Sequence, residues 1–394
     1  MAKSIEHPSL MEPMLPAQGN RELEDLAVVM IEKSARMAAQ LHPLVQVRIG
    51  QLVRTMNCYY SNLIEGHNTN PRDIELALKA DFSNNPEKRD LQLEAKAHIE
   101  VQMLLDQKQN LTDTFSQANI KLVHKEFYAR LPESLCWVKN PDTDDTIAIV
   151  PGEFRAGDVM VGRHVPPKAA NIVAFLERFE QAYNFASLSR IEQIITVAAA
   201  HHRLLWIHPF YDGNGRVTRL ISHLALRQAG VGNNLWSISR GLARNAQLYK
   251  ANLDLADGQR EGDLDGRGNL SQKQLANFCV FFLQTAIDQI DFMQKLLDTP
   301  NLMQRIEHYA HSQIQAKKLP KGSVIVLKEA LLHGLVERNS IQNLTGYADR
   351  QSRNIVSSLV KAGLLGSDTP YGSLYLCFPQ EIVEFYFPQL YPVV

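Results

Sequence analysis

Residues 208–219 read His-Pro-Phe-Tyr-Asp-Gly-Asn-Gly-Arg-Val-Thr-Arg, a polar, glycine-rich run between two apolar helical stretches. The preceding stretch covers residues 191–207 and the following one residues 217–228. This arrangement predicts a loop that turns directly into a helix, with free backbone N–H groups at the helix start. Because such groups favour a bound phosphate, the run predicts a nucleotide site.

The glycines and arginines of this run suit a polyphosphate. Gly213 and Gly215 let the backbone adopt unusual φ values and approach an anion closely, and Asn214 tolerates such conformations. Arg216 and Arg219 are three residues apart, so they lie on one helical face, where their planar guanidinium groups can clamp phosphate oxygens.

Two further residues of the run supply reactive groups. Asp212 offers a hard carboxylate oxygen for Mg²⁺, which usually binds through one or two carboxylates together with substrate phosphates and water. His208 is the natural general base. Phe210 has no reactive atom, and we expect it to anchor the loop in the core.

The run resembles the Fic motif, H-P-F-x-D-G-N-G-R-x-x-R, and matches every fixed position of that pattern. The resemblance implies a protein adenylyltransferase, in which the histidine deprotonates a target hydroxyl, the acidic residue holds Mg²⁺ and the Gly-Asn-Gly-Arg turn binds the phosphates of ATP. The product would be a protein that carries AMP on a Ser, Thr or Tyr hydroxyl, either a partner or the chain itself. These roles fall on His208, Asp212, Gly213, Asn214, Gly215, Arg216 and Arg219. The alternative is a surface loop between two core helices.

A second segment, Ser61-Asn62-Leu63-Ile64-Glu65-Gly66, resembles the inhibitory motif of the same family, S/T-x-x-x-E-G/N. The resemblance implies an N-terminal inhibitory helix that carries Ser61 and Glu65. Glu65 would pair with Arg219, the arginine that should hold the γ-phosphate, so that ATP binds unproductively. The alternative is an exposed glutamate at a helix end before a glycine C-cap.

Residues 152–167 alternate β-forming residues with glycines and end in a Pro-Pro breaker, which predicts a hairpin. The segment resembles the Fic flap, which pairs with an extended segment of the target by strand addition. Val161 and Arg163 would then be contacts at the flap tip. A structural hairpin without a partner is the alternative.

Residues 239–241 and 249–252 fall where the family builds its nucleotide-base pocket. Tyr249 and Asn252 lie on one helical face, where an aromatic ring and an amide can contact adenine, although the pattern fits a core tyrosine equally well. His201 and His202 lie in an apolar helical stretch and are interpreted as packing residues rather than metal ligands.

Composition is typical of a soluble enzyme. The chain has 394 residues, which suggests two or three units, and its formal net charge of −1 gives no general drive toward nucleic acid or membrane. The four cysteines are far apart and lack a C-x-x-C pattern, which predicts reduced, buried thiols and a cytoplasmic location. No apolar run approaches about 18 residues and no signal peptide is visible, so we expect no membrane partner.

Apolar periodicity predicts a mainly α fold, a Fic-type helical bundle with a short β-hairpin flap. We expect an N-terminal helical region over residues 1–110 and a catalytic core over residues 111–300. Relatives often self-associate, and the sequence leaves a homodimer open.

The sequence pattern changes from about residue 317. Helix candidates at residues 322–334, 340–346 and 350–362 precede an alternating, wing-like stretch at residues 371–378. Residues 317–394 therefore resemble a winged helix-turn-helix domain.

The candidate recognition helix of this domain carries few positive charges, namely Arg350, Arg353 and Lys361. DNA binding and a structural or dimerising role thus both stay open. The alternative function is a nucleotide-sensing transcriptional regulator that acts through this domain. A further alternative is the reverse function, in which the same site removes AMP from a modified protein.

Overall fold

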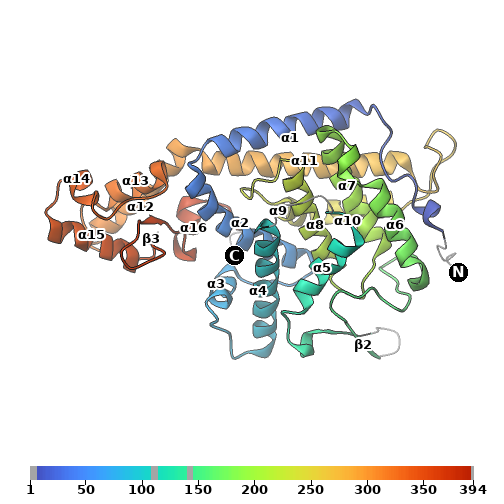
Figure 1. Cartoon of the computed structure of the whole chain (residues 1–394), viewed down its shortest axis with the longest axis horizontal. Helices are drawn as coiled ribbons and strands as arrows, with labels where there is room; N and C mark the ends of the chain where they lie inside the picture. The colour runs from blue at the N-terminus through green and yellow to red at the C-terminus, as the bar shows by residue number, and fades with distance from the viewer. Residues whose placement is uncertain (1–6, 108–113, 140–144, 392–394) are drawn as a thin grey trace. The chain divides into compact units, whose positions relative to one another are not determined.

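The computed structural model describes residues 7–107, 114–139 and 145–391, and the fold is mainly helical (Figure 1). In the described residues the strands form two small antiparallel sheets. The predicted fold class is thereby confirmed. The chain divides into two compact units, one comprising residues 1–32, 57–233 and 237–289 and the other residues 33–56, 234–236 and 290–394.

The first unit is built mainly from helices of eight to twenty-two residues. It contains α3 (Pro71–Leu78), α4 (Pro86–Gln107), α5 (Gln117–Tyr128), α6 (Ile172–Ala182), α7 (Arg190–Ile207), α8 (Asn214–Gln228), the shorter α9 (Ile238–Arg244) and α10 (Ala246–Ala256). Short 3-10 turns are η1 (Pro8–Met11), η2 (Glu133–Leu135), η3 (Ala169–Asn171) and η4 (Phe185–Ser187). Three helices contribute residues to both units: α1 (Arg21–Ala39), α2 (Pro43–Ile64) and α11 (Gln272–Leu297).

Helices α7 and α8 form the centre of the first unit and lie side by side in Figure 1. Helix α7 starts with a capping box, in which the Ser189 hydroxyl accepts from Glu192 N–H and the Glu192 carboxylate accepts from Ser189 N–H at 2.7 Å. Most of α7 beyond its first turn is buried, as is most of α8. Helix α6 packs on α7, and α4 and α5 pack on α8. The connection between α7 and α8 is therefore held from several sides.

Of the hairpin predicted at residues 152–167, the structure forms only the tip. The only β interaction there, within the described residues, is an isolated bridge between Val161 and His164. Instead the unit's two-stranded sheet pairs β1 (Trp137–Lys139) with β2 (Thr146–Ala148). The pairing does not extend beyond this bridge, and nearer the start of the segment Arg155 N–H donates to Pro209 O at 2.9 Å instead.

The second unit includes α12 (Thr299–Gln315), α13 (Ser323–His333), α14 (Ile341–Thr345), α15 (Asp349–Lys361) and α16 (Gln380–Tyr386). Strand β3 (Leu365–Gly366) pairs with β4 (Tyr375–Leu376), and a bridge joins Val336 to Leu374. The three predicted helices are present within one residue of their expected ends. Their order before the sheet is that of a winged helix-turn-helix, an assignment that stays a prediction.

The cysteines are all free thiols in the structure. Cys58 and Cys279 are buried as expected, whereas Cys136 and Cys377 are only half-buried. Burial raises the pKa of Cys279 to about 12, so this thiol stays protonated at neutral pH. The predicted burial is therefore correct for two of the four thiols.

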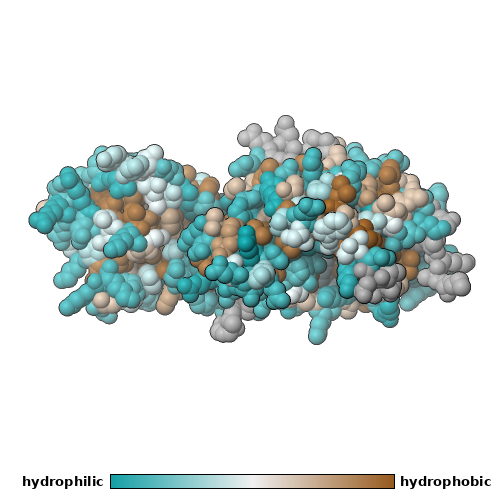
Figure 2. Space-filling model, turned by 90° about the horizontal axis from the view of Figure 1, so that it is seen from below, coloured by the Kyte–Doolittle hydropathy of each residue, from teal (hydrophilic) through white to brown (hydrophobic). Residues whose placement is uncertain are grey.

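No helix among the described residues is long and apolar enough to cross a membrane. The face drawn in Figure 2 is mostly hydrophilic, with hydrophobic residues interspersed rather than gathered into a belt.

Candidate active site

The turn between α7 and α8 is the centre of the candidate site. His208 ends α7 in the left-handed region, with φ 50° and ψ 61°, and Gly213 precedes α8 with φ 80°. A Cβ on Gly213 would lie 2.9 Å from a ring carbon of Tyr128, so only glycine fits there. Gly213, the N-cap residue of α8, has no side chain to cap the helix, and its own N–H donates to the Asp212 carboxylate. The N–H groups that follow it at the start of α8 are those suited to an anion.

Asn214 closes this turn. Its side-chain amide donates to Phe210 O at 2.8 Å and accepts from Phe210 N–H at 3.0 Å. Phe210 is buried, as expected for an anchor, and its ring stacks on His124 with centroids 3.8 Å apart. The Asn214 side chain thus shapes the loop, and its contribution to a phosphate site would come from the backbone.

Asp212 is held by two donors on one oxygen. Its Oδ2 accepts from the Tyr128 hydroxyl at 2.5 Å and from Arg216 Nη2 at 3.0 Å. Burial opposes ionisation, but Arg216, Tyr128 and Gly213 N–H outweigh it and hold the pKa of Asp212 below its ordinary value. The side chain is 48% exposed, so an ionised carboxylate faces the solvent side of the turn. Tyr128 was not among the residues that the sequence singled out.

Arg216 is clamped between carboxylates. Its side chain is only 5% exposed, its Nη1 donates to Glu94 at 3.1 Å and its Nη2 to Asp212. Glu94 also accepts from His67 Nδ1 at 2.7 Å, and this hydrogen bond raises the pKa of His67. Arg216 therefore orients Asp212 in this structure, and the helical spacing alone did not reveal Glu94 or His67 as neighbours.

Glu65 and Ser61 both contact Arg219. Arg219 donates from Nε to the Ser61 hydroxyl at 2.9 Å, from Nη2 to Ser61 O at 3.2 Å, and from Nη2 to Glu65 Oε1. Burial raises the pKa of Glu65, but the Arg219 charge and hydrogen bond outweigh it, and the net shift is downward. Glu65 is therefore ionised at neutral pH and forms a salt bridge with the Arg219 guanidinium.

Gly215 makes room for this contact. A Cβ built on Gly215 would overlap Glu65 Oε1 and would lie 3.0 Å from Arg219 Nη1. The glycine of the turn thus accommodates the glutamate 150 positions upstream, a relationship that the printed sequence does not display.

His208 is held in its neutral form. Burial, the Arg155 guanidinium and His164 together lower the pKa of His208 to about 4. At neutral pH its imidazole can therefore accept a proton.

The residues predicted at the flap tip are exposed. Val161 is bridged to His164 through N–H···O bonds of 2.9 and 3.0 Å, and the Arg163 side chain is 85% exposed. Arg163 also donates to Asp254 of α10 at 2.6 Å. The tip of this loop is therefore tied to α10 while its outer edge remains accessible.

Tyr249 lies in the core. It is 2% exposed, and its hydroxyl is 2.7 Å from His201 Nε2. Ser222 donates to Thr218 O, so its oxygen accepts from His201 Nδ1–H, and Tyr249 must donate to His201 Nε2. Asn252 is half-buried and its amide donates to Leu248 O at 2.9 Å.

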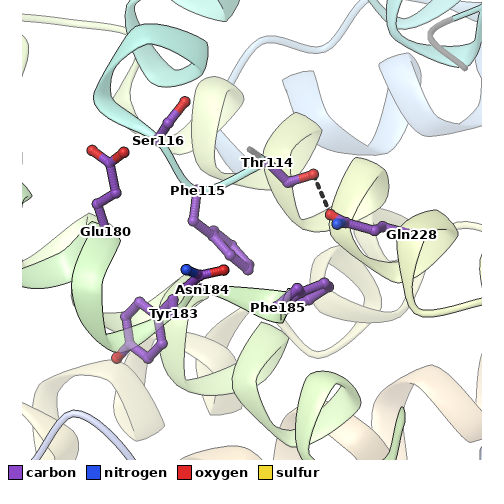
Figure 3. A pocket seen from close by; sticks show the side chains of 8 residues that line it. All are labelled: Thr114, Phe115, Ser116, Glu180, Tyr183, Asn184, Phe185 and Gln228. Atoms are coloured by element: carbon purple, nitrogen blue, oxygen red, sulfur yellow. Dashed lines mark hydrogen bonds between the residues drawn. The ribbon is translucent and has the colours of Figure 1, made fainter. Parts of the chain in front are cut away.

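His201 and His202 are buried, as expected for packing residues. In the part of the chain that the structure describes, no group of three or more His, Cys, Asp or Glu side chains could hold a metal by itself. A pocket elsewhere in the first unit contains no motif residue (Figure 3). It is lined by Thr114, Phe115, Ser116, Glu180, Tyr183, Asn184, Phe185 and Gln228, and the Thr114 hydroxyl donates to Gln228 at 2.5 Å.

Comparison with known families places the turn within a recognised domain. Residues 114–226 match the model of the Fic/DOC family. They form a Fic domain. The Fic domain contains the whole run from His208 to Arg219, whereas Ser61 and Glu65 lie upstream of the matched residues. The Fic domain predicted from the motif is thereby confirmed.

The chain is similar over part of its length to curated proteins named Protein adenylyltransferase Fic. Those from Drosophila erecta and Drosophila yakuba are 42% and 43% identical over 79 residues. The matched segment covers 20% of this chain and only 16% of each relative.

Two solved structures share the fold. A Fic family protein from Desulfovibrio desulfuricans aligns over 92% of this chain and 98% of its own, with TM-score 0.54 and 15% identity. A Fic domain containing signaling protein from Bacteroides thetaiotaomicron aligns over 68% of this chain and 97% of its own, with TM-score 0.50 and 17% identity. At these identities the likeness concerns the fold alone.

Proposed function

We propose that this chain transfers AMP from ATP to a hydroxyl side chain of a target protein or of itself. The observation that carries the proposal is the convergence of a neutral His208, an ionised Asp212 and the uncapped N-terminus of α8 on one turn. The turn lies in the Fic domain, and curated proteins similar to part of the chain are named adenylyltransferases, which supports the choice of reaction.

His208 acts as the general base in the proposed reaction. Its imidazole takes the proton of the target hydroxyl, the oxygen attacks the α-phosphorus, and the bond between the α-phosphorus and the bridging oxygen breaks. Pyrophosphate leaves and the AMP remains on the protein. Catalysis then rests on positioning and on charge stabilisation by the α8 N-terminus, where the backbone N–H groups of Asn214 and Gly215 face the phosphates.

Asp212 is the residue that fits Mg²⁺. An ionised, half-exposed carboxylate beside a phosphate-binding helix start suits a cation that takes one carboxylate, phosphates and water. When bound, Mg²⁺ supplies charge neutralisation on the phosphates. Arg216 holds this carboxylate in place by donating a hydrogen bond to its Oδ2.

Glu65 keeps this site inactive in the proposal. It occupies Arg219, which would otherwise contact the γ-phosphate, and Ser61 holds the same guanidinium from a second direction. Activation then requires Glu65 to leave.

The exposed loop tip is proposed to hold the target. Val161 and Arg163 lie at its accessible edge, where an extended target segment can add by backbone hydrogen bonds. Because Tyr249 lies in the core with its hydroxyl engaged, we leave it out of the proposed nucleotide site, and Asn252 stays a candidate contact to the base.

The reaction type is tested with ATP labelled at either the α- or the γ-phosphate. In a Glu65→Gly background we expect Mg²⁺-dependent transfer of the α-label to protein, none of the γ-label, and loss of transfer on adding His208→Ala. Transfer of the γ-label instead would make the chain a kinase and reject the proposal.

A second candidate function is DNA binding by the second unit. It is favoured by the outer face of α15, where Arg350, Gln351 and Asn354 are exposed while Ile355 and Leu359 are buried. Arginine, glutamine and asparagine are side chains that contact base edges in the major groove. Retardation of duplex DNA by the full chain, weakened by Arg350→Ala and by salt, would support this candidate; no retardation at low salt would reject it.

A further inference from the structure

We propose that Arg155 is a positioning residue for His208, holding the backbone of the candidate base from the neighbouring 152–167 loop. This inference rests on the proposed role of His208 as base. Arg155 lies 53 positions upstream and belongs to the loop whose tip is proposed to receive the target.

Arg155 holds the end of α7 through two hydrogen bonds. Its side-chain Nε donates to His208 O at 2.8 Å, and its backbone N–H donates to Pro209 O at 2.9 Å. Both acceptors belong to the residues where the chain leaves α7 for the turn. Arg155 therefore fixes two successive peptide groups at the candidate base.

The remaining nitrogens of Arg155 hold its own loop. Nη1 donates to Gly157 O at 3.0 Å and Nη2 to Pro167 O. Gly157 and Pro167 lie on opposite sides of the Val161–His164 bridge. One guanidinium thus joins both arms of the exposed loop to His208.

The backbone of His208 needs such support. A residue with a Cβ rarely adopts φ 50°, and such a conformation persists only where the surroundings over-determine it. The carbonyl that accepts from Arg155 is the one that follows this φ, so removing the guanidinium frees the torsions that aim the imidazole.

The charge of Arg155 provides a second effect at the same place. Arg155 is 2% exposed, and the carboxylate of Asp158 lies 4.0 Å from its Nη1 and is itself largely exposed. Its charge is therefore poorly neutralised where it faces His208. The other titratable groups that influence His208 are His164, which acts in the same direction, and Asp212, which opposes it.

The test uses two variants in the Glu65→Gly background, followed by NMR titration of the His208 ring, assigned with His208→Gln. Arg155→Gln removes the charge, and we expect the His208 pKa to rise by about 0.5 to 1 unit and AMP transfer at pH 7 to fall about 10- to 100-fold. Arg155→Lys keeps the charge but cannot reach three carbonyls, so transfer falls while the His208 pKa moves little.

Arg267→Gln is the matched control, because it removes the same charge from an exposed position of the first unit. We expect it to change neither the His208 pKa nor transfer.

An unchanged His208 pKa in a folded Arg155→Gln variant overturns the electrostatic effect. Unchanged transfer in Arg155→Lys overturns the positioning role, and this variant serves on its own if Arg155→Gln fails to fold. If the Glu65→Gly background transfers no AMP at all, the proposed function fails. The NMR titration still measures the effect of Arg155 on the pKa of His208.

Discussion

The carboxylate of Glu65 contacts the guanidinium of Arg219 although the two residues are 154 positions apart. Ser61, one helical turn before Glu65, binds the same guanidinium from another side. Arg219 is almost fully buried in this arrangement. An upstream helix end thus occupies a side chain of the motif, and the state of this contact decides whether the proposed site can work.

Removing the Ser61 hydroxyl should weaken this contact without abolishing it. A hydrogen bond to a charged group contributes about 1.5 to 3 kcal/mol, so Ser61→Ala should raise AMP transfer roughly 10- to 100-fold, and less than Glu65→Gly does. The rates at which the two variants and the unmodified chain incorporate label from ATP test this prediction. A Ser61→Ala variant as inactive as the unmodified chain would show that the hydroxyl plays no part.

Gly215 provides a test of the close approach of Glu65. A methyl group in Gly215→Ala would overlap Glu65 Oε1, so the substitution should cost about 1 to 3 kcal/mol of stability in the unmodified chain. In the Glu65→Gly background the cost should shrink, because the overlapping oxygen is gone. Thermal unfolding of the four chains gives the coupling, and equal losses in both backgrounds would refute the contact.

The Tyr128 hydroxyl should matter for the metal. Tyr128→Phe keeps the ring that packs on Gly213 but removes a donor to Asp212, so Mn²⁺ binding with a non-hydrolysable ATP analogue should weaken roughly 10-fold. Tyr183→Phe, which removes a hydroxyl that donates to Met14 O, is the control. Equal Mn²⁺ affinities by electron paramagnetic resonance would count against the role of Asp212.

The pH dependence of transfer follows from His208. Its pKa is lowered to about 4, so the neutral, proton-accepting form is present at neutral pH and is lost as the pH falls through that value. In Glu65→Gly, transfer should be nearly constant between about pH 6 and 8 and should decline only below about pH 5. A decline centred near pH 6.5, the ordinary value for histidine, would contradict the burial of this imidazole.

The sequence predicted the parts of the site that lie close together along the chain. His208, Asp212 and Arg219 lie on one turn and the helix that follows it, because a short turn joins two apolar helices, a pattern that spacing displays directly. The pairing of Glu65 with Arg219 was expected only from a resemblance, since no local pattern relates residues so far apart.

Other contacts left no signal in the sequence. Tyr128 and Glu94 are single residues on ordinary helices, and only packing brings them to Asp212 and Arg216. The alternation over residues 152–167 predicted a hairpin, of which only the Val161–His164 bridge forms, because Arg155 directs the start of that segment toward the α7–α8 turn. Tyr249 fitted a base contact and a core position equally well by spacing, and its burial depends on packing around His201.

The most direct test of the account is the intact mass of the chain after incubation with ATP and Mg²⁺. The account predicts that Glu65→Gly gains the mass of one or more AMP groups, that the unmodified chain gains far less, and that Glu65→Gly with His208→Ala gains none. Equal gains by the unmodified chain and Glu65→Gly, or a gain that survives His208→Ala, would contradict it.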